Sequence, residues 1–198
     1  MDSGLSKSNL ERVAREPKTH DFATILFSRP VDENGVKELV KVVSQFIHAG
    51  ASGVHITIHS GGGVPTNGPF FGSVIRTMNL AAIGHVAGDA FSEAGNLFAS
   101  FPYRTISHTG RVGFHQASMK LDAGSYPESR ISDLLSQVRG LNQSMIENVV
   151  KALGVSDTEA RKWFAEGATF VGEQAKLARI AHEVLEPKID KYDIMLMG

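Results

Sequence analysis

Two segments of the sequence place a serine and a histidine where nucleophilic chemistry is feasible. The chain contains no cysteine, so serine, threonine, lysine and carboxylate side chains are its remaining nucleophiles. Ser92 follows the apolar run 82–87 and precedes a predicted helix. Backbone amides at the start of a helix lack intrahelical acceptors, so they favour negative charge that develops near Ser92. A serine at this place is also a common helix N-cap, and both interpretations stay open.

His115 is the candidate general base for Ser92. It directly follows the short apolar strand predicted at 112–114, and histidine changes its charge close to neutral pH. The alternative is a structural histidine held by hydrogen bonds. A third candidate feature is the run Gly61-Gly62-Gly63, which could present backbone amides to an oxyanion or could simply form a tight turn. It lacks the pattern of phosphate-binding loops.

The order of predicted elements indicates where these residues meet. Apolar runs at 23–28, 54–58 and 82–87 read as strands, and helical spacing of apolar residues connects them over 36–47 and 70–80. Alternating strands and helices predict an α/β fold with parallel strands and right-handed crossovers. Ligand sites in such folds form at the carboxyl ends of the strands, so we expect the site near residues 60–63 and 88–95.

The longest predicted helix covers residues 128–153. One apolar stripe runs through all of it, and at 1.5 Å per residue it measures ~39 Å. A helix of that length overhangs a domain of this size and predicts a contact between copies of the chain. We expect one domain over residues 21–198, preceded by a loosely ordered segment 1–20.

Composition excludes several classes of function. Twenty basic residues against 21 acidic ones leave a formal net charge of −1, which argues against binding to nucleic acid or to an anionic membrane surface. The polar N-terminus and the lack of a long apolar run predict a cytoplasmic protein. His55 and His59 lie about 13 Å apart on an extended strand, too far apart for one metal ion, so we expect no metal site and no cofactor.

Four motifs in order resemble the Clp protease proteolytic subunit (ClpP) family, from about residue 22 to residue 186. Residues 59–68 (HSGGGVPTNG) resemble its glycine turn, and residues 88–95 (GDAFSEAG) resemble the segment around its nucleophilic serine. Residues 113–116 (GFHQ) resemble its histidine segment, and residues 170–175 (FVGEQA) resemble a segment near its end. The resemblance implies a ClpP/crotonase-like fold of repeated β-β-α units, with residues 128–153 as the protruding handle helix.

The resemblance also implies roles for individual residues in a serine peptidase. Ser92 attacks the peptide carbonyl, and His115 acts first as general base and then as general acid. The main-chain amides of Gly63 and Glu93 form the oxyanion hole. The family's aspartate falls at Gly167 in this chain, so the neighbouring Glu166 becomes the candidate third member of a triad.

The partners implied by the resemblance are a peptide or unfolded protein substrate and further copies of the chain. The family forms seven-membered rings that stack in pairs and work with an AAA+ unfoldase. The N-terminal segment shows no clear match to the family's axial loops, which makes the unfoldase the weaker of these expectations. Two alternatives are a catalytically silent ring subunit or scaffold, and an acyl-CoA enzyme of the related crotonase fold.

Overall fold

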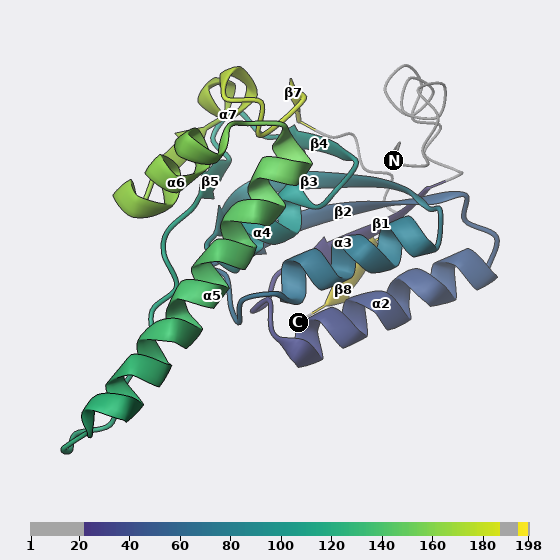
Figure 1. Cartoon of the computed structure of the whole chain (residues 1–198). Coiled ribbons are helices and arrows are strands. Elements are labelled where there is room, and N and C mark those ends of the chain that lie inside the picture. Colours follow the sequence, from purple (N-terminus) through teal and green to yellow (C-terminus); the bar gives the residue numbers. More distant parts are fainter. Residues whose placement is uncertain (1–21, 187–193, 198) are drawn as a thin grey trace.

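The computed structural model of the protein describes residues 22–186 and 194–197 (Figure 1). The predicted loosely ordered segment 1–20 lies outside the described residues. The described residues form an eight-stranded, mostly parallel sheet with helices packed beside it. This arrangement confirms the predicted α/β class.

The sheet has the strand order β6-β5-β3-β2-β1-β8, and β4 and β7 form a branch that starts from β3. Every neighbouring pair is parallel except β5 and β6. The strands are β1 Phe22–Phe27, β2 Gly53–Ser60, β3 Ala81–Phe91, β4 Tyr103–Ile106, β5 Arg111–Gly113, β6 Thr169–Val171, β7 Glu183–Val184 and β8 Ile194–Met197.

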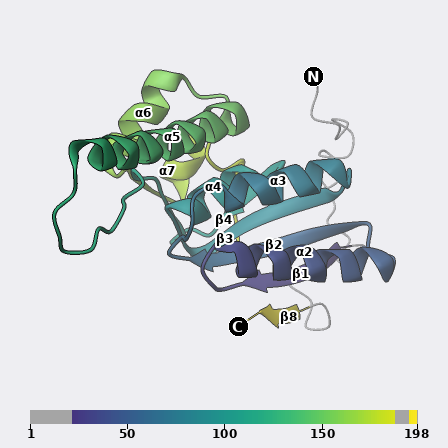
Figure 2. The same cartoon turned by 60° about the horizontal axis from the view of Figure 1, so that its bottom comes forward.

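Helices α2 (Glu33–His48) and α3 (Asn67–Thr77) lie side by side along one face of the sheet (Figures 1 and 2). Each helix links two neighbouring parallel strands, β1 to β2 and β2 to β3. Right-handed crossovers that proceed in the same direction place both helices on the same face. They bury alternate residues of the central strands, such as Ile25, Ile56 and Val86, which are fully buried in the core.

Helix α5 (Glu128–Leu153) has the bounds that the apolar stripe predicts, and its first half projects away from the sheet (Figure 1). Its second half is anchored by buried residues such as Met145 and Val149. On the projecting half, Ile131 and Leu135 are 54% and 47% exposed. No helix within the described residues is long and apolar enough to cross a lipid bilayer.

Three short helices complete the described part of the chain. They are α4 (Glu93–Ala99), α6 (Asp157–Glu166) and α7 (Glu173–Leu177). Every residue of α4 is buried, because this helix lies between α3 and α5. The segment that follows Ser92 is therefore enclosed on both sides, which limits how far the chain there can move.

The strand end predicted at Gly88 is wrong, because β3 continues to Phe91. The pairing of β2 with β3 shifts between Ile58 and Ser60, and it resumes where Ser60 pairs with Ala90. Asp89 N donates a hydrogen bond to His59 Nδ1 across this bulge, at 3.1 Å. The Gly-Asp pair that suggests a turn in the sequence thus forms a β-bulge, and the strand carries on up to Ser92.

Candidate functional site

Ser92 occupies a strained turn between β3 and α4. Its backbone angles are φ 55° and ψ −123°, a combination that is unfavourable for any residue with a Cβ atom. The residue lies at the N-cap position of α4, but its hydroxyl makes no capping hydrogen bond. The interpretation of Ser92 as a helix-capping side chain is therefore wrong. Its hydroxyl is not engaged in a capping hydrogen bond.

The glycine run packs directly against this turn. Gly62 has φ +108°, and a Cβ atom built on it would lie 2.7 Å from both Phe91 O and Ser92 Cβ. Val31 forms a parallel bridge with Gly63, in which Val31 N donates to Gly62 O and Val64 N donates to Val31 O. The main-chain groups of a bridge residue that do not bond to the bridge partner point to the opposite side. The Gly63 amide therefore points away from Val31.

Replacing Gly62 by alanine is expected to lower both stability and reactivity at Ser92. The methyl group would overlap Phe91 O and Ser92 Cβ, and alanine disfavours a φ of +108°. We expect the free energy of unfolding to fall by roughly 2–4 kcal/mol, measured by urea denaturation. Gly61→Ala is the matched control, because a Cβ atom there meets nothing within 4 Å. Equal stability of the two variants would contradict the packing described here.

Glu93 begins α4, so its amide is one of those that a helix leaves without an intrahelical acceptor. The sequence also places a carboxylate at this position, beside the predicted oxyanion hole. In the structure the side chain is fully buried and reaches the start of α3, where Glu93 Oε1 accepts a hydrogen bond from Gly68 N at 2.7 Å. The carboxyl group is therefore engaged with α3.

Burial raises the pKa of the Glu93 carboxyl from 4.5 to about 7, although the hydrogen bond from the Gly68 amide and the nearby Thr66 amide oppose this shift. The folded chain thus binds this proton more tightly than the unfolded chain does. For this group, the free energy of unfolding falls as pH rises from about 4.5 to about 7, and the loss is complete above that pH.

Glu93→Gln, which cannot ionise, is expected to remove this loss of stability. Relative to the wild type, the variant should gain up to on the order of 3 kcal/mol when the pH is raised from 4 to 8. Urea unfolding at both pH values measures the difference. A stability difference between variant and wild type that does not change with pH would show that Glu93 titrates normally.

His115 lies two residues beyond the end of β5, next to the Ser92 turn. Phe91 pairs with Gly113, and Ser92 N donates to Gly113 O at 2.9 Å. The His115 side chain is exposed, and its Nδ1 lies 2.8 Å from Gln116 O. A carbonyl oxygen can only accept, so this contact requires a proton on Nδ1. It leaves the lone pair on Nε2, which is the tautomer that a general base needs.

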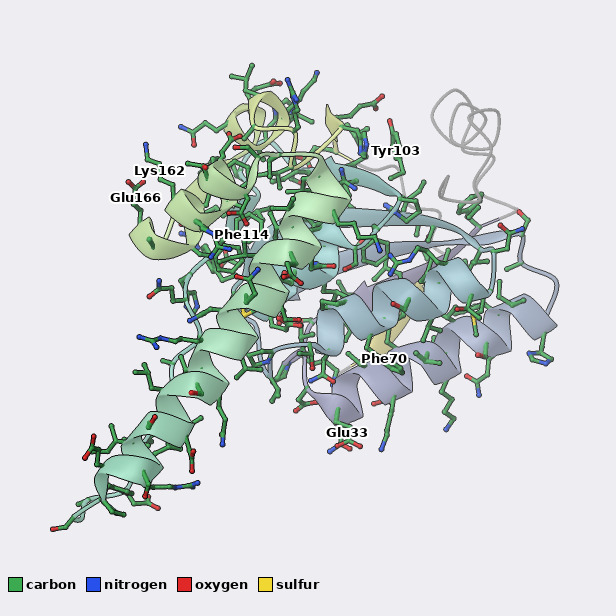
Figure 3. The ribbon with its side chains drawn as sticks, in the orientation of Figure 1. Glu33, Phe70, Tyr103, Phe114, Lys162 and Glu166 are labelled. Atoms are coloured by element: carbon green, nitrogen blue, oxygen red, sulfur yellow. The ribbon has the colours of Figure 1, made fainter. Side chains whose placement is uncertain are left out.

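Glu166 is the last residue of α6, and its side chain is exposed. Gly167 ends the helix with φ 65°, and its amide donates to Trp163 O. Figure 3 shows the Glu166 side chain at the outer end of α6. Among the described residues, Glu166 makes no hydrogen bond or ion pair with His115, whose Nδ1 is bonded to Gln116 O. The structure brings Ser92, the glycine run and the His115 segment together, and it leaves Glu166 outside this group.

Glu166→Gln is expected to change any activity that depends on Ser92 by less than about threefold. The carboxylate is exposed and does not contact His115, so its removal leaves the imidazole in place. Lys162→Gln is the matched control, because Lys162 is also an exposed residue of α6. The rate of peptide cleavage by both variants measures the effect. A loss of 10²-fold or more in Glu166→Gln alone would place this carboxylate in the site.

A second serine and histidine in contact lie elsewhere in the sheet. His85 Nε2 is 3.1 Å from Ser107 Oγ, and the Ser107 hydroxyl donates to Glu186 Oε2 at 2.7 Å. The serine proton is therefore used, and His85 acts as the donor to Ser107 instead of as its base. Ser107 is 3% exposed, which closes it to a substrate. This chain of hydrogen bonds is structural, and Ser92 remains the candidate nucleophile.

Sequence reasoning missed two contacts at the site, the one between His115 and Gln116 O and the one between the Glu93 carboxyl group and Gly68 N. Every residue has a carbonyl oxygen, so no signal in the sequence marks Gln116. The only signal for the Glu93 contact is an acidic residue at the start of a mostly apolar segment, Glu93–Ala99. The site can nevertheless be described as a strained serine, a glycine turn and a histidine at one edge of a parallel sheet.

Neither a family model nor a curated protein matches this sequence. The described residues themselves define the class, a mostly parallel α/β protein. Ser92, the glycine run and His115 lie together at the carboxyl end of β3. Within the described residues, no group of three histidine, cysteine, aspartate or glutamate side chains could hold a metal ion.

Proposed function

We propose that the chain is a serine peptidase subunit with a ClpP/crotonase-like fold. The observation that carries this proposal is the backbone of Ser92, where a residue other than glycine is held at φ 55° in a sharp turn from strand to helix. Such turns expose a nucleophilic hydroxyl in hydrolases, and strained backbones concentrate at functional sites. The glycine turn packed against Ser92 supports the same proposal.

In the proposed reaction, His115 Nε2 takes the proton of the Ser92 hydroxyl as its oxygen attacks the peptide carbonyl carbon. The oxyanion that forms accepts hydrogen bonds from the amides of Gly63 and Glu93. His115 then gives its proton to the leaving amine, and an acyl-enzyme remains on Ser92. Water, deprotonated by His115, releases the second product. Gln116 O holds the imidazole in the required tautomer, the role that the resemblance assigns to Glu166.

The proposed assembly is a ring of copies, of seven members by resemblance to the family, with α5 as its handle helix. The exposed Ile131 and Leu135 on the projecting half of α5 support a contact between copies there. Peptides and unfolded proteins in the cytoplasm are the proposed substrates. By the same resemblance, a second stacked ring and an AAA+ unfoldase are the proposed further partners.

Covalent labelling with a fluorophosphonate tests the proposal directly. Intact-mass spectrometry of the wild type should show one adduct, and Ser92→Ala should show none. Ser107→Ala is the matched control, because Ser107 also contacts a histidine but is buried, and this variant should keep the adduct. A folded, ring-forming wild-type chain that takes no label would overturn the peptidase.

A catalytically silent ring subunit is the second candidate. The observation that favours it is His115, which is exposed and has a backbone carbonyl where a peptidase triad has a carboxylate. The same labelling experiment separates the two functions. The silent subunit predicts no adduct together with normal assembly, measured by the mass of the native oligomer.

A further inference from the structure

Glu93 is the most unusual buried group at the site. It is 0% exposed, Oε1 bonds to Gly68 N at 2.7 Å, and Oε2 has no hydrogen-bond partner among the described residues. Burying a carboxyl group with one unsatisfied oxygen costs free energy, so its presence calls for an explanation. The reaction proposed above uses only the backbone amide of this residue and leaves its side chain without a role.

The Glu93 side chain extends from α4 and caps the start of α3. Thr66 holds the N-cap position of α3, but its own side chain makes no capping hydrogen bond. Its φ of 81° is unfavourable for a β-branched residue and persists only if neighbouring groups hold it. The buried carboxyl group bonds the amide of Gly68 and faces that of Thr66, so it supplies the missing cap.

The segment that Glu93 caps is the continuation of the glycine run. Only Val64 and Pro65 separate Gly63 from Thr66, and proline removes one of the backbone rotations in between. The position of Thr66 and Gly68 therefore limits where the Gly63 amide can lie. On the other side of this amide, the segment is held by the bridge between Val31 and Gly63 and by the hydrogen bond that Gly62 N donates to Ser60 Oγ.

We propose that the Glu93 side chain is a positioning residue that keeps the two oxyanion donors in register. Its main-chain amide is one donor, and its carboxyl group anchors the segment that carries the other donor, Gly63. This inference rests on the proposed peptidase function. It explains why a carboxyl group is buried in α4, since a side chain without acceptors leaves the start of α3 without a cap.

Three substitutions test the acceptor and its placement. Glu93→Met keeps the length of the side chain and removes both acceptors, whereas Glu93→Gln keeps one acceptor oxygen. Glu93→Asp keeps the carboxyl group but withdraws it from Gly68 N by one methylene group. Glu173→Gln is the matched control, because Glu173 also begins a short helix after a turn with positive φ but is exposed.

The rate of fluorophosphonate labelling and the kcat and KM of peptide cleavage are the first measurements. We expect Glu93→Met to lower kcat and the labelling rate by about 10- to 100-fold with KM within about twofold, because a displaced donor weakens the transition state. Glu93→Asp should lose about 10-fold, and Glu93→Gln and Glu173→Gln less than about fivefold. Wild-type rates in Glu93→Met or in Glu93→Asp would overturn the proposal.

Hydrogen–deuterium exchange of residues 61–70, followed by mass spectrometry in the Ser92→Ala background, tests the anchor without using activity. Faster exchange of this segment in Glu93→Met and in Glu93→Asp, but not in Glu173→Gln, is expected. Unchanged exchange in both would overturn the anchoring role, and Glu93→Asp decides alone if Glu93→Met does not fold. A wild-type chain that is never labelled would overturn the peptidase and the role in catalysis, while the exchange data would still decide the anchor.

Discussion

Replacing Ser92 by alanine is expected to lower the rate of peptide cleavage by about 10⁴- to 10⁶-fold, with KM nearly unchanged. Without the hydroxyl no acyl-enzyme forms, and only the oxyanion donors and substrate binding still assist water. The buried Ser107 is not expected to substitute for Ser92. Ser107, the other serine beside a histidine, is buried and gives its proton to Glu186.

Cleavage of a short fluorogenic peptide without ATP is the appropriate measurement. The Ser92→Ala chain should fold and assemble like the wild type, since alanine removes only a hydroxyl that makes no capping bond. Thr66→Ser keeps the Ser92 hydroxyl, so its cleavage rate shows how strongly a substitution elsewhere in this region affects the measurement. If Ser92→Ala retained more than about 1% of the wild-type rate, the nucleophile would have to be another group.

We expect the second large effect for His115→Ala, which should lower kcat by about 10³- to 10⁵-fold. This variant retains the serine hydroxyl but lacks a base to take its proton. Labelling of Ser92 by a fluorophosphonate should slow in parallel, because it requires the same proton transfer. Both rates, measured on one preparation, separate this loss from a failure to bind peptide.

His48→Ala is the matched control for this experiment. His48 is also an exposed histidine whose Nδ1 contacts a main-chain carbonyl, that of Ser44 at 2.7 Å, but it lies at the end of α2. The control variant should keep wild-type rates. A His115→Ala chain with unchanged labelling would show that Ser92 is activated by another group or is intrinsically reactive.

The sequence patterns predict the elements well where one periodicity runs without interruption. The apolar stripe of α5 predicts its bounds, Glu128–Leu153, because the stripe continues without interruption between Pro127 and Gly154, which ends the helix with φ 68°. The end of β3 is predicted wrongly at Gly88, since a bulge and a turn use the same residue types. Whether a glycine closes a strand depends on the neighbouring strand, and a single sequence does not contain that partner.

In the candidate site, the sequence likewise indicates some residues but not the contacts that depend on packing. Ser92, His115 and the glycine run stand out because their types and places relative to strands suggest chemistry. The direction of the Glu93 side chain, toward Gly68 N, depends on how α3 and α4 pack. The Nδ1 partner of His115 is a carbonyl group that every residue has, so residue types favour Glu166 and the backbone supplies Gln116 instead.

The strained turn at Ser92 makes a substitution by glycine at this position stabilising. Gly172 adopts nearly the same conformation before α7, with φ 42° and ψ −110°, and carries no side chain that would strain it. A glycine at position 92 would relieve strain of about 1–2 kcal/mol. A lineage that no longer needed the hydroxyl would gain stability from that single substitution, so the serine at position 92 costs stability that only a use of its hydroxyl would offset. Chains of this fold that carry glycine there would be expected to have lost the chemistry while keeping the architecture.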